Sequence, residues 1–411
     1  MPASWPEYTL KEVCIRITDG AHQSPKSVDI GLPMASVKDL TPFGINMETC
    51  RKISEHDFKE LVRQDCQPRV GDVLIAKDGA TALDTVCEIR QSLNVVLLSS
   101  VAILRPDSNK IYPGFLRYYM DCDTTREYLK NGFITGAAIP RVVLEDFKRA
   151  KIKLPPLSIQ RKIAAILSAY DDLIENNTRR IKILEEMAQS LYREWFVRLR
   201  FPGHEKVPKV DSPLGRIPEG WEVKTFGEVA LNFDSRRKPL SSMQRSQRRG
   251  EYPYYGAAKI LDYIDDFIFY GKYLLVAEDG SVITPNGKPV LQLVNAKFWV
   301  NNHTHIIQGK TPMSTEFLYY RLLDLEISGY ITGAAQPKIT QANLNRIPIV
   351  VPTKQILLRF NEIAENCVSK SINLQRRSEN LRRTRDFLLP KFISGELNVE
   401  NLEIKVEGIN S

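Results

Sequence analysis

The chain contains few of the residues that build disulfide frameworks or metal centres. Among its 411 residues there are six cysteines and five histidines, and no two cysteines form a CxxC pair. Disulfide scaffolds and zinc ribbons need closely spaced cysteines, so we expect free thiols in a reducing compartment and no metal site. The expected location is the cytoplasm.

Long hydrophobic runs are also missing. A helix that spans a bilayer needs about 20 predominantly apolar residues, whereas the longest apolar runs, such as Val95–Leu98, are far shorter. No basic segment followed by an apolar one opens the chain, so a secretory signal is not expected.

The composition is that of a globular protein, with 43% hydrophobic and 26% charged residues. A chain of 411 residues exceeds the length at which a single core usually stops growing, so two or more domains are expected. The formal net charge of +8 favours a polyanionic partner, without identifying it.

The clearest feature is an internal repeat. ITGAAIPRV begins at Ile134 and ITGAAQPKI begins 197 residues later, and the same offset continues to Pro155 and Pro352. Upstream, LIAKDGAT (74–81) aligns with LVAEDGSV (275–282) at an offset of 201, and WPEYTLKEV (5–13) aligns with WEVKTFGEV (221–229) at 216. So long a spacing indicates a duplicated domain rather than a solenoid. The drifting offset indicates loops of different length within each copy.

Each copy ends in a long helical pattern with apolar residues at steps of three and four, which is typical of a coiled-coil seam. Asn177 is a polar interruption of the first stripe. The stripe residues, expected to pair the helices or to dock partners, are Ile163, Ile166, Tyr170, Leu173, Ile181, Leu184, Leu191, Trp195, Phe360, Ile363, Leu374, Leu381, Leu388 and Phe392. Antiparallel pairing of the two helices is the simplest way to bury both stripes.

The expected fold is α+β, with two pseudo-symmetric mixed α/β recognition domains separated by two long helices that pair as an antiparallel coiled coil. The predicted boundaries are a first domain over 1–153, a spacer helix over 154–200, a linker over 201–220, a second domain over 221–350, a second spacer helix over 351–395 and a tail over 396–411.

These motifs resemble the specificity subunit of type I restriction–modification systems. The resemblance lies in GDVLIAKDGA, ITGAAIPRV and IKLPPLSIQRKIAAIL in the first half, and in YPYYGA, AEDGS, FWVNNHTHI and ITGAAQPKI in the second. It covers roughly residues 4–396, and the joint order and duplication of the motifs make it specific.

The resemblance implies a non-catalytic subunit in which each domain recognises one part of a split DNA target. The two helices would set the distance between the half-sites and dock two modification subunits, with restriction subunits as further partners. This chain would bind no cofactor, since S-adenosylmethionine, ATP and Mg²⁺ would belong to the partners. The second copy departs from the PPLxxQ pattern and has VPTKQ, so the two helix starts are not expected to dock partners identically.

Basic and polar segments supply candidate DNA contacts. The segment 234–250 has six cations and no acid after Asp234, and we interpret it as a loop that contacts phosphates. NNHTHI (301–306) and DGAHQSPKS (19–27) add groups that could donate to base edges or phosphates. The candidates are His22, Gln23, Lys26, Lys77, Thr81, Arg236, Arg237, Lys238, Arg245, Arg248, Arg249, Lys259, Asn301, Asn302, His303 and His305. For each of them a solvated loop or a packing role is the alternative.

Other functional classes lack their motifs. Asp78 and Asp279 each precede a glycine after a strand, which is more typical of a turn than of a catalytic carboxylate. A self-contained DNA methyltransferase would need an Asn/Asp-Pro-Pro-aromatic tetrad and a glycine-rich loop, and a nuclease would need clustered carboxylates with a lysine. A protein-only coiled-coil adaptor would explain the helices but not the two duplicated basic domains. We therefore expect a non-catalytic DNA-binding scaffold.

Overall fold

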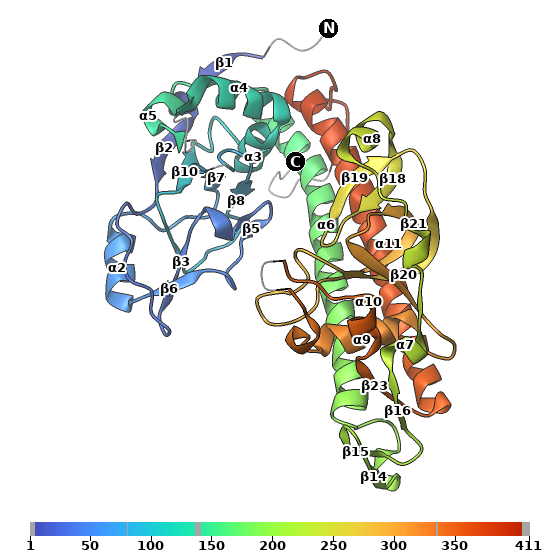
Figure 1. Cartoon of the computed structure of the whole chain (residues 1–411). Coiled ribbons are helices and arrows are strands. Elements are labelled where there is room, and N and C mark those ends of the chain that lie inside the picture. The colour runs from blue at the N-terminus through green and yellow to red at the C-terminus, as the bar shows by residue number, and fades with distance from the viewer. Residues whose placement is uncertain (1–4, 80, 136–140, 334–335, 405–411) are drawn as a thin grey trace. The chain divides into compact units, whose positions relative to one another are not determined.

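The computed structural model describes residues 5–79, 81–135, 141–333 and 336–404. The chain divides into two compact units. Unit 1 contains residues 1–177 and 377–411, and unit 2 contains residues 178–376. Each unit therefore holds one globular domain together with one half of each long helix (Figure 1).

Unit 1 is built around a four-stranded sheet of order β2-β10-β7-β8, next to a three-stranded sheet β6-β3-β9. Its elements are β1 (Glu7–Thr9), α1 (Leu10–Val13), β2 (Cys14–Asp19), β3 (Leu32–Ala35), β4 (Leu40–Thr41), β5 (Gly44–Ile45), β6 (Arg51–Ile53), α2 (Glu55–Arg63), β7 (Val73–Ala76), β8 (Val86–Glu88), β9 (Val96–Leu97), β10 (Val101–Pro106), α3 (Pro113–Asp121), α4 (Asp123–Phe133), β11 (Ile134–Thr135), β12 (Arg141–Val142), α5 (Leu144–Phe147) and β13 (Lys151–Lys153).

Unit 2 is built around a six-stranded sheet of order β17-β22-β20-β21-β18-β19. Its elements are β14 (Lys209–Ser212), β15 (Gly215–Pro218), β16 (Glu222–Thr225), α7 (Phe226–Val229), β17 (Ala230–Asn232), α8 (Ser242–Gln247), β18 (Arg249–Tyr255), β19 (Ile260–Ile264), β20 (Phe269–Ala277), β21 (Leu291–Val300), β22 (Thr304–Gly309), α9 (Thr315–Asp324), α10 (Gln341–Asn345) and β23 (Pro348–Val351).

Four of the six strands of the unit 2 sheet have the same topology as the four-stranded sheet of unit 1, as the repeat predicts. β7 pairs antiparallel with β8 and β10, and β10 pairs with β2; in unit 2, β20 pairs with β21 and β22, and β22 pairs with β17. Each domain is also closed by a two-stranded pair that joins its beginning to its end, β1 with β13 and β16 with β23. The duplication is therefore structural as well as sequential.

The central strand of each sheet is apolar at successive positions because both of its faces are covered. In β7, Val73 and Ile75 belong to one core cluster, while Leu74 and Ala76 belong to another. In β20, Leu274 and Leu275 divide in the same way. Strand side chains alternate between the two faces of a sheet, so an uninterrupted apolar run needs a core on each side.

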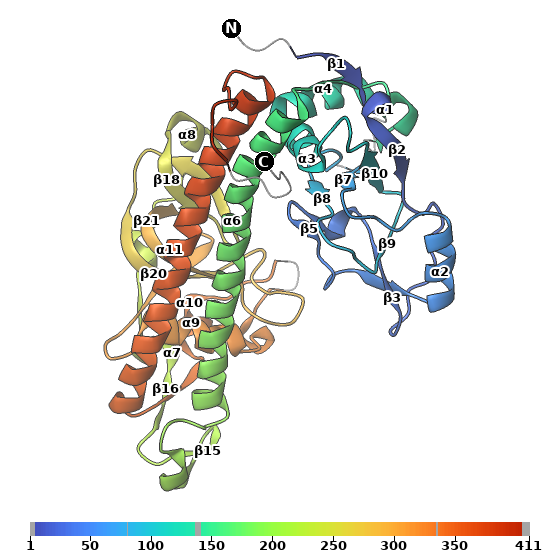
Figure 2. The same cartoon turned by 180° about the vertical axis from the view of Figure 1, so that it is seen from behind.

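The long helices are α6 (Leu157–Tyr192), which continues as a π-helical turn over Arg193–Val197, and α11 (Lys354–Ile393). Within each unit their corresponding halves lie side by side (Figures 1 and 2). In unit 1, Asn177 Nδ2 donates to Ser378 Oγ at 3.2 Å. In unit 2, the rings of Tyr192 and Phe360 are 5.9 Å apart. Early residues of one helix thus meet late residues of the other, which confirms antiparallel pairing.

The seam differs from the predicted stripe at two positions. Leu173 and Ile363 are 54% and 42% exposed, while the adjacent Ile174 and Ala364 are fully buried. A helix advances about 100° per residue, so the apolar pattern alone does not decide which of two adjacent apolar residues faces the partner. The polar interruption is confirmed, because Asn177 is buried and paired.

Residues 201–220, predicted as a linker, contain the hairpin β14–β15 and the buried side chains of Phe201 and Ile217. All six cysteines are free, as expected. None of the helices in the described part of the chain combines the length and the hydrophobicity that crossing a bilayer requires.

Candidate nucleic-acid interface

In unit 1, segments that are distant in the sequence meet at one edge of the central sheet. The turn after β7 begins at Lys77, whose amide donates to the carbonyl of Ser100 at 2.8 Å. The carbonyl of Lys77 accepts from the amide of Val142 in β12 at 3.1 Å. The Lys77 side chain forms an ion pair with Asp19, the last residue of β2. The turn, the end of β2, the segment that leads into β10 and the segment after the ITGAA motif therefore form one site.

Unit 2 repeats this site with the same backbone contacts. The amide of Glu278 donates to the carbonyl of His303 at 2.9 Å, and the amide of Ile339 donates to the carbonyl of Glu278 at 2.9 Å. The two units also share an isolated antiparallel β-bridge at this place. Asp78 bridges to Arg141 in unit 1, and Asp279 bridges to Lys338 in unit 2. The Asp-Gly turns are thus pinned between two neighbouring segments, which supports their interpretation as turns.

Most residues of the repeated Gly-Ala-Ala motifs lie outside the described part of the chain, which omits 136–140 and 334–335. Gly333 is described and has φ of +88°, a left-handed conformation that suits glycine. A Cβ at this position would lie 2.4 Å from the carbonyl oxygen of Gln336, so close approach of the backbone also requires glycine here.

The charges that hold the two sites differ. In unit 1, Lys77 is 3% exposed and neutralises Asp19, which also contacts the exposed His22 at 3.2 Å. In unit 2, Asp234 pairs instead with the buried His305, with 2.6 Å between Asp234 Oδ2 and His305 Nδ1. His305 Nε2 lies 2.8 Å from the carbonyl oxygen of Ile339, so both ring nitrogens face acceptors.

This geometry favours a protonated His305. Burial opposes the charge, but the hydrogen bond and charge of Asp234 raise the pKa of His305 above its usual value. Burial would also raise the pKa of Asp234, yet its contact with His305 lowers it below the usual value. Both shifts favour a charged imidazolium–carboxylate contact between these two buried groups.

Asp234, Glu278 and His305 offer three ligand atoms within 4.8 Å of one another, a grouping that metal ions can use. Two further cations already contact Glu278, namely Arg237 at 2.6 Å and Lys338 at 3.1 Å. Two carboxylates here face two basic side chains and a protonated histidine, so a divalent ion would add uncompensated charge. The donor set fits a proton and an ion network better than a metal.

The segment predicted as a basic loop is partly ordered secondary structure. Residues 234–236 form a 3-10 turn, α8 follows over Ser242–Gln247, and β18 begins at Arg249. A capping box at Ser241 and Gln244 starts α8, a local signal that the charge pattern concealed. The interpretation of the whole segment as a loop is therefore wrong.

Several of its cations are already engaged. Arg237 donates to Glu278 and to the carbonyls of Asn302 and Thr304. Arg245 lies 5.0 Å above the ring of Tyr254, and Arg248 lies 5.1 Å above Trp299 and contacts Asp265 at 2.9 Å. These side chains hold the segment onto the sheet before any ligand arrives.

The predicted DNA-contacting residues divide into two groups by exposure. Three of them are buried, namely Lys77, Asn301 and His305, and two are partly covered, namely Arg245 and Arg248. Arg237 is 17% exposed. The exposed residues are His22, Gln23, Lys26, Thr81, Arg236, Lys238, Arg249, Lys259, Asn302 and His303. The buried and partly covered residues support the site, and the exposed ones are open to solvent.

Sequence reasoning missed four residues that the structure places at these sites. Asp19 is the last residue of β2, and Asp234 lies two residues after the end of the equivalent outer strand β17. Arg141 and Lys338 follow the ITGAA repeat at the same offset of 197. Arg141 and Lys338 could have been predicted from the repeat, because a basic residue stands at the same position in both copies.

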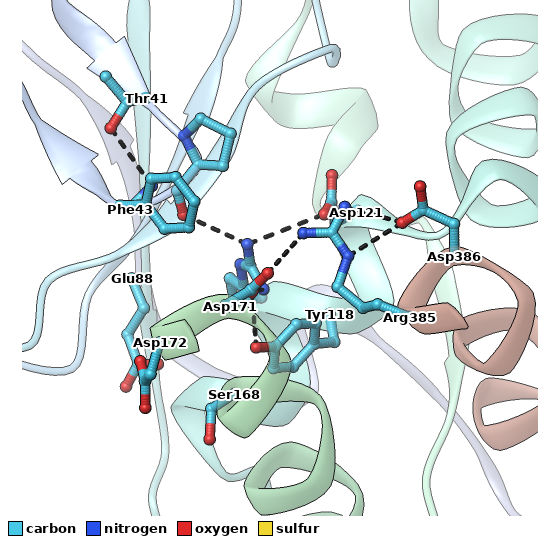
Figure 3. Close-up of polar contacts among 12 residues, drawn as sticks. Thr41, Phe43, Glu88, Tyr118, Asp121, Ser168, Asp171, Asp172, Arg385 and Asp386 are labelled. Carbon is cyan, nitrogen blue, oxygen red and sulfur yellow. Dashed lines mark hydrogen bonds and ion pairs between the residues drawn. The ribbon is translucent and has the colours of Figure 1, made fainter. Parts of the chain in front are cut away.

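The helix pair carries a second polar site in unit 1 (Figure 3). Asp171 of α6 accepts from Arg117 of α3 and from Arg385 of α11, both at 2.5 Å, and from the Tyr118 hydroxyl at 2.8 Å. Burial would raise the pKa of Asp171, but the two guanidinium groups hold it below its usual value. Arg117 also donates to the carbonyl of Pro42 at 3.2 Å, which links this node to the domain.

The PPLxxQ motif has a structural explanation. The buried Gln160 side chain accepts from the amide of Tyr112 at 2.8 Å and donates to the carbonyls of Lys110 and Pro155. At the same offset of 197 the second copy has the fully buried Leu357. The missing motif in unit 2 thus reflects an apolar version of the same joint.

The chain matches the family of the type I restriction modification DNA specificity domain over residues 2–186 and 218–365, and it belongs to this family. It is 28% identical over 304 residues to the type I restriction enzyme MjaIX specificity subunit of Methanocaldococcus jannaschii, covering 70% of each chain. It is 20% identical over 376 residues to the HindI specificity subunit of Haemophilus influenzae, covering 74% of this chain and 82% of that one. The crystal structure of the S subunit of a type I restriction–modification system from M. genitalium has the same fold, with a TM-score of 0.60, 15% identity, and coverage of 95% and 96%.

Proposed function

We propose that this chain is the non-catalytic DNA-recognition subunit of a type I restriction–modification complex, with each unit recognising one half of a bipartite target. The observation that carries the proposal is the duplicated sheet edge, where the same backbone frame presents different exposed side chains in the two units. A shared frame with divergent side chains suits two related domains that recognise different short sequences. The net charge of +8 supports a nucleic-acid partner.

The partners follow from this role. Two modification subunits would dock on the helices α6 and α11, where exposed apolar side chains such as Leu173, Met187 and Phe387 remain outside the seam. Restriction subunits would join through the same complex. S-adenosylmethionine, ATP and Mg²⁺ would be bound by these partners, and this chain would supply target choice alone.

The experiment is to produce the modification subunits with and without this chain and to sequence the host DNA for methylated adenines. We expect a single bipartite motif that appears only with this chain. A matched pair of hybrids, in which each domain in turn is replaced by a domain from a relative, should change one half of the motif and leave the other half unchanged. Methylation with the same motif in the absence of this chain would refute the proposal.

The helices allow a second measurement. If they set the half-site spacing, an insertion of four residues after Asn177 should change the number of unspecified bases between the half-sites. The half-site sequences themselves should stay the same, which separates an altered spacing from a damaged domain. An unchanged spacing in an active complex would contradict the role of the helices as a ruler.

A further inference from the structure

The turn aspartate of each unit lies within ion-pair distance of one exposed basic side chain. In unit 1, Asp78 Oδ1 lies 3.2 Å from Arg141 Nε, and Arg141 is 53% exposed. In unit 2, Asp279 Oδ1 lies 2.5 Å from His303 Nδ1, and His303 is 46% exposed. Asp78 and Asp279 are equivalent residues of the repeat, so the same position orients an arginine in one unit and a histidine in the other.

We propose that Arg141 and His303 are base-reading side chains, each oriented by the turn aspartate beside it, and that Arg141 reads guanine. This inference rests on the proposed function and deepens it, because it assigns a residue and a base to one half-site. Asp78 and Asp279 act as positioning residues that do not touch the DNA themselves.

The carboxylates argue for base contact over phosphate contact. A cation that only neutralises a phosphate gains nothing from a neighbouring carboxylate, since the pair nearly cancels its own charge and the carboxylate repels the phosphate. A side chain that must meet a base edge at a fixed angle gains from being held, because less conformational entropy is lost on binding. An exposed Asp–Arg or Asp–His pair therefore suits recognition of base edges.

Arginine in this arrangement matches guanine. The contact with Asp78 uses Nε, and among the described residues the two terminal nitrogens of Arg141 meet no hydrogen-bond acceptor. Two parallel N–H donors fit O6 and N7 of guanine in the major groove, a bidentate contact that no other base offers in that form. The equivalent residue of unit 2, Lys338, is instead a point charge that contacts Glu278 at 3.1 Å and lacks this fork.

The histidine of unit 2 offers a single ring nitrogen to a base. Its Nδ1 faces Asp279, so a contact with a base edge falls to Nε2. The half-site of unit 2 should therefore contain one specified position that depends on His303.

The test uses the complete complex with its modification subunits and sequences methylated host DNA for three variants. Arg141→Ala should relax one guanine in the half-site of unit 1, with a loss of discrimination of roughly 5- to 150-fold, and should leave the other half-site and the spacing unchanged. Arg141→Lys should relax the same position, since it keeps the charge but not the fork. His303→Ala should relax one position in the other half-site only.

The positioning role has its own readout. Asp78→Asn should reduce discrimination at the same guanine while methylation of the original motif persists, whereas a purely structural role would lower total methylation without relaxing any base. Arg16→Ala is the matched control, because Arg16 is 48% exposed and lies 2.7 Å from Asp65 in the same unit; this variant should keep the original motif.

The outcomes separate the two proposals. Wild-type methylation that does not depend on this chain would overturn the proposed function itself. A chain-dependent motif that is unchanged by Arg141→Ala and His303→Ala in folded, active complexes would overturn only the base-reading assignment. If Arg141→Ala relaxed a position that is not guanine, the assignment of the base would be wrong.

Discussion

Units 1 and 2 solve the same structural problem with different chemistry. At the joint between domain and helices, unit 1 buries an ion node around Asp171, whereas at the same offset of 197 unit 2 has Val368. The residue equivalent to Arg385 is the fully buried Ala188. Unit 2 leaves an open cavity of about 290 Å³ beside Val368, lined in part by Tyr319 and Tyr320. The same backbone topology is thus compatible with either a charged or an apolar joint between the domain and the helices.

The two units should differ most in the loss of unfolding free energy that mutations at this joint cause. Asp171→Ala leaves Arg117, which is 2% exposed, as a buried charge without its main partner, so unit 1 should lose about 3–5 kcal/mol of unfolding free energy. Val368→Ala in unit 2 removes only the apolar contacts of two methyl groups. It should lower the unfolding free energy by roughly 1–2 kcal/mol in total. Hydrogen exchange measured separately in the amides of each unit would report both values, and equal losses would contradict the contrast.

The equivalent sheet edges should differ in their response to pH. The raised pKa of His305 means that its contribution to stability is fully present below the unfolded pKa of about 6.5 and is lost as pH rises through the folded value. His305→Gln should cost about 1.5–3 kcal/mol at pH 6 and progressively less at higher pH. Urea midpoints followed by tryptophan fluorescence from pH 5.5 to 8.5 would test this, since Trp299 lies in unit 2. A constant difference between wild type and variant across this range would rule out the protonated pair.

Exchange of the equivalent residues at the two helix starts should destabilise both units. Gln160→Leu introduces the residue of the second copy, but it leaves buried backbone groups of Tyr112 and Pro155 without partners. We expect a loss of about 1–3 kcal/mol in unit 1. The reciprocal Leu357→Gln should also destabilise unit 2, because it places a polar amide at a fully buried apolar position. Hydrogen exchange at the first turn of each helix would measure these effects, and a neutral Gln160→Leu would show that the motif serves docking instead.

Surface cations of unit 2 should give the smallest effects. Lys238→Ala and Arg249→Ala remove exposed charges that contact phosphates if the interface is as proposed, so each should weaken binding of the complex to all sequences by a similar factor. The slope of log affinity against log salt should fall by about one for each lost phosphate contact. Lys182→Ala, an exposed position on α6, is a matched control. A change of the preferred motif would contradict a role limited to phosphates.

Much of the fold follows from patterns in the sequence. The repeat at 197 predicts two domains of one topology, and the stripes predict paired helices, because duplication and periodicity are properties of the chain itself. The choice of Ile174 over Leu173 could not be predicted in this way, since it depends on the angle at which α11 approaches. The basic segment 234–250 was misinterpreted for a similar reason, because its arginines contact aromatic rings and acids that lie outside the segment.

The candidate site shows the same limit. His303 and the turn aspartates stand out in the sequence, but the pairing of Asp279 with His303 and of Asp78 with Arg141 joins segments 24 and 63 residues apart. A single residue separates His303 from His305, yet His305 is buried in an ion network and His303 is exposed. Alternation along a strand predicts that residues two apart share a face, and here the strand begins only at Thr304, so the pattern does not apply to His303.

The sequence by itself determined the duplicated architecture, the helical seam with its polar break at Asn177, and membership of the family, because these depend on order and spacing along the chain. Only the tertiary structure decided which charged side chains form ion pairs within the protein and which remain exposed. Ion pairs and aromatic stacking act over a few ångströms in space, whatever the separation in sequence, so the partners of Lys77, Arg237 and Arg141 became visible only once the chain was folded.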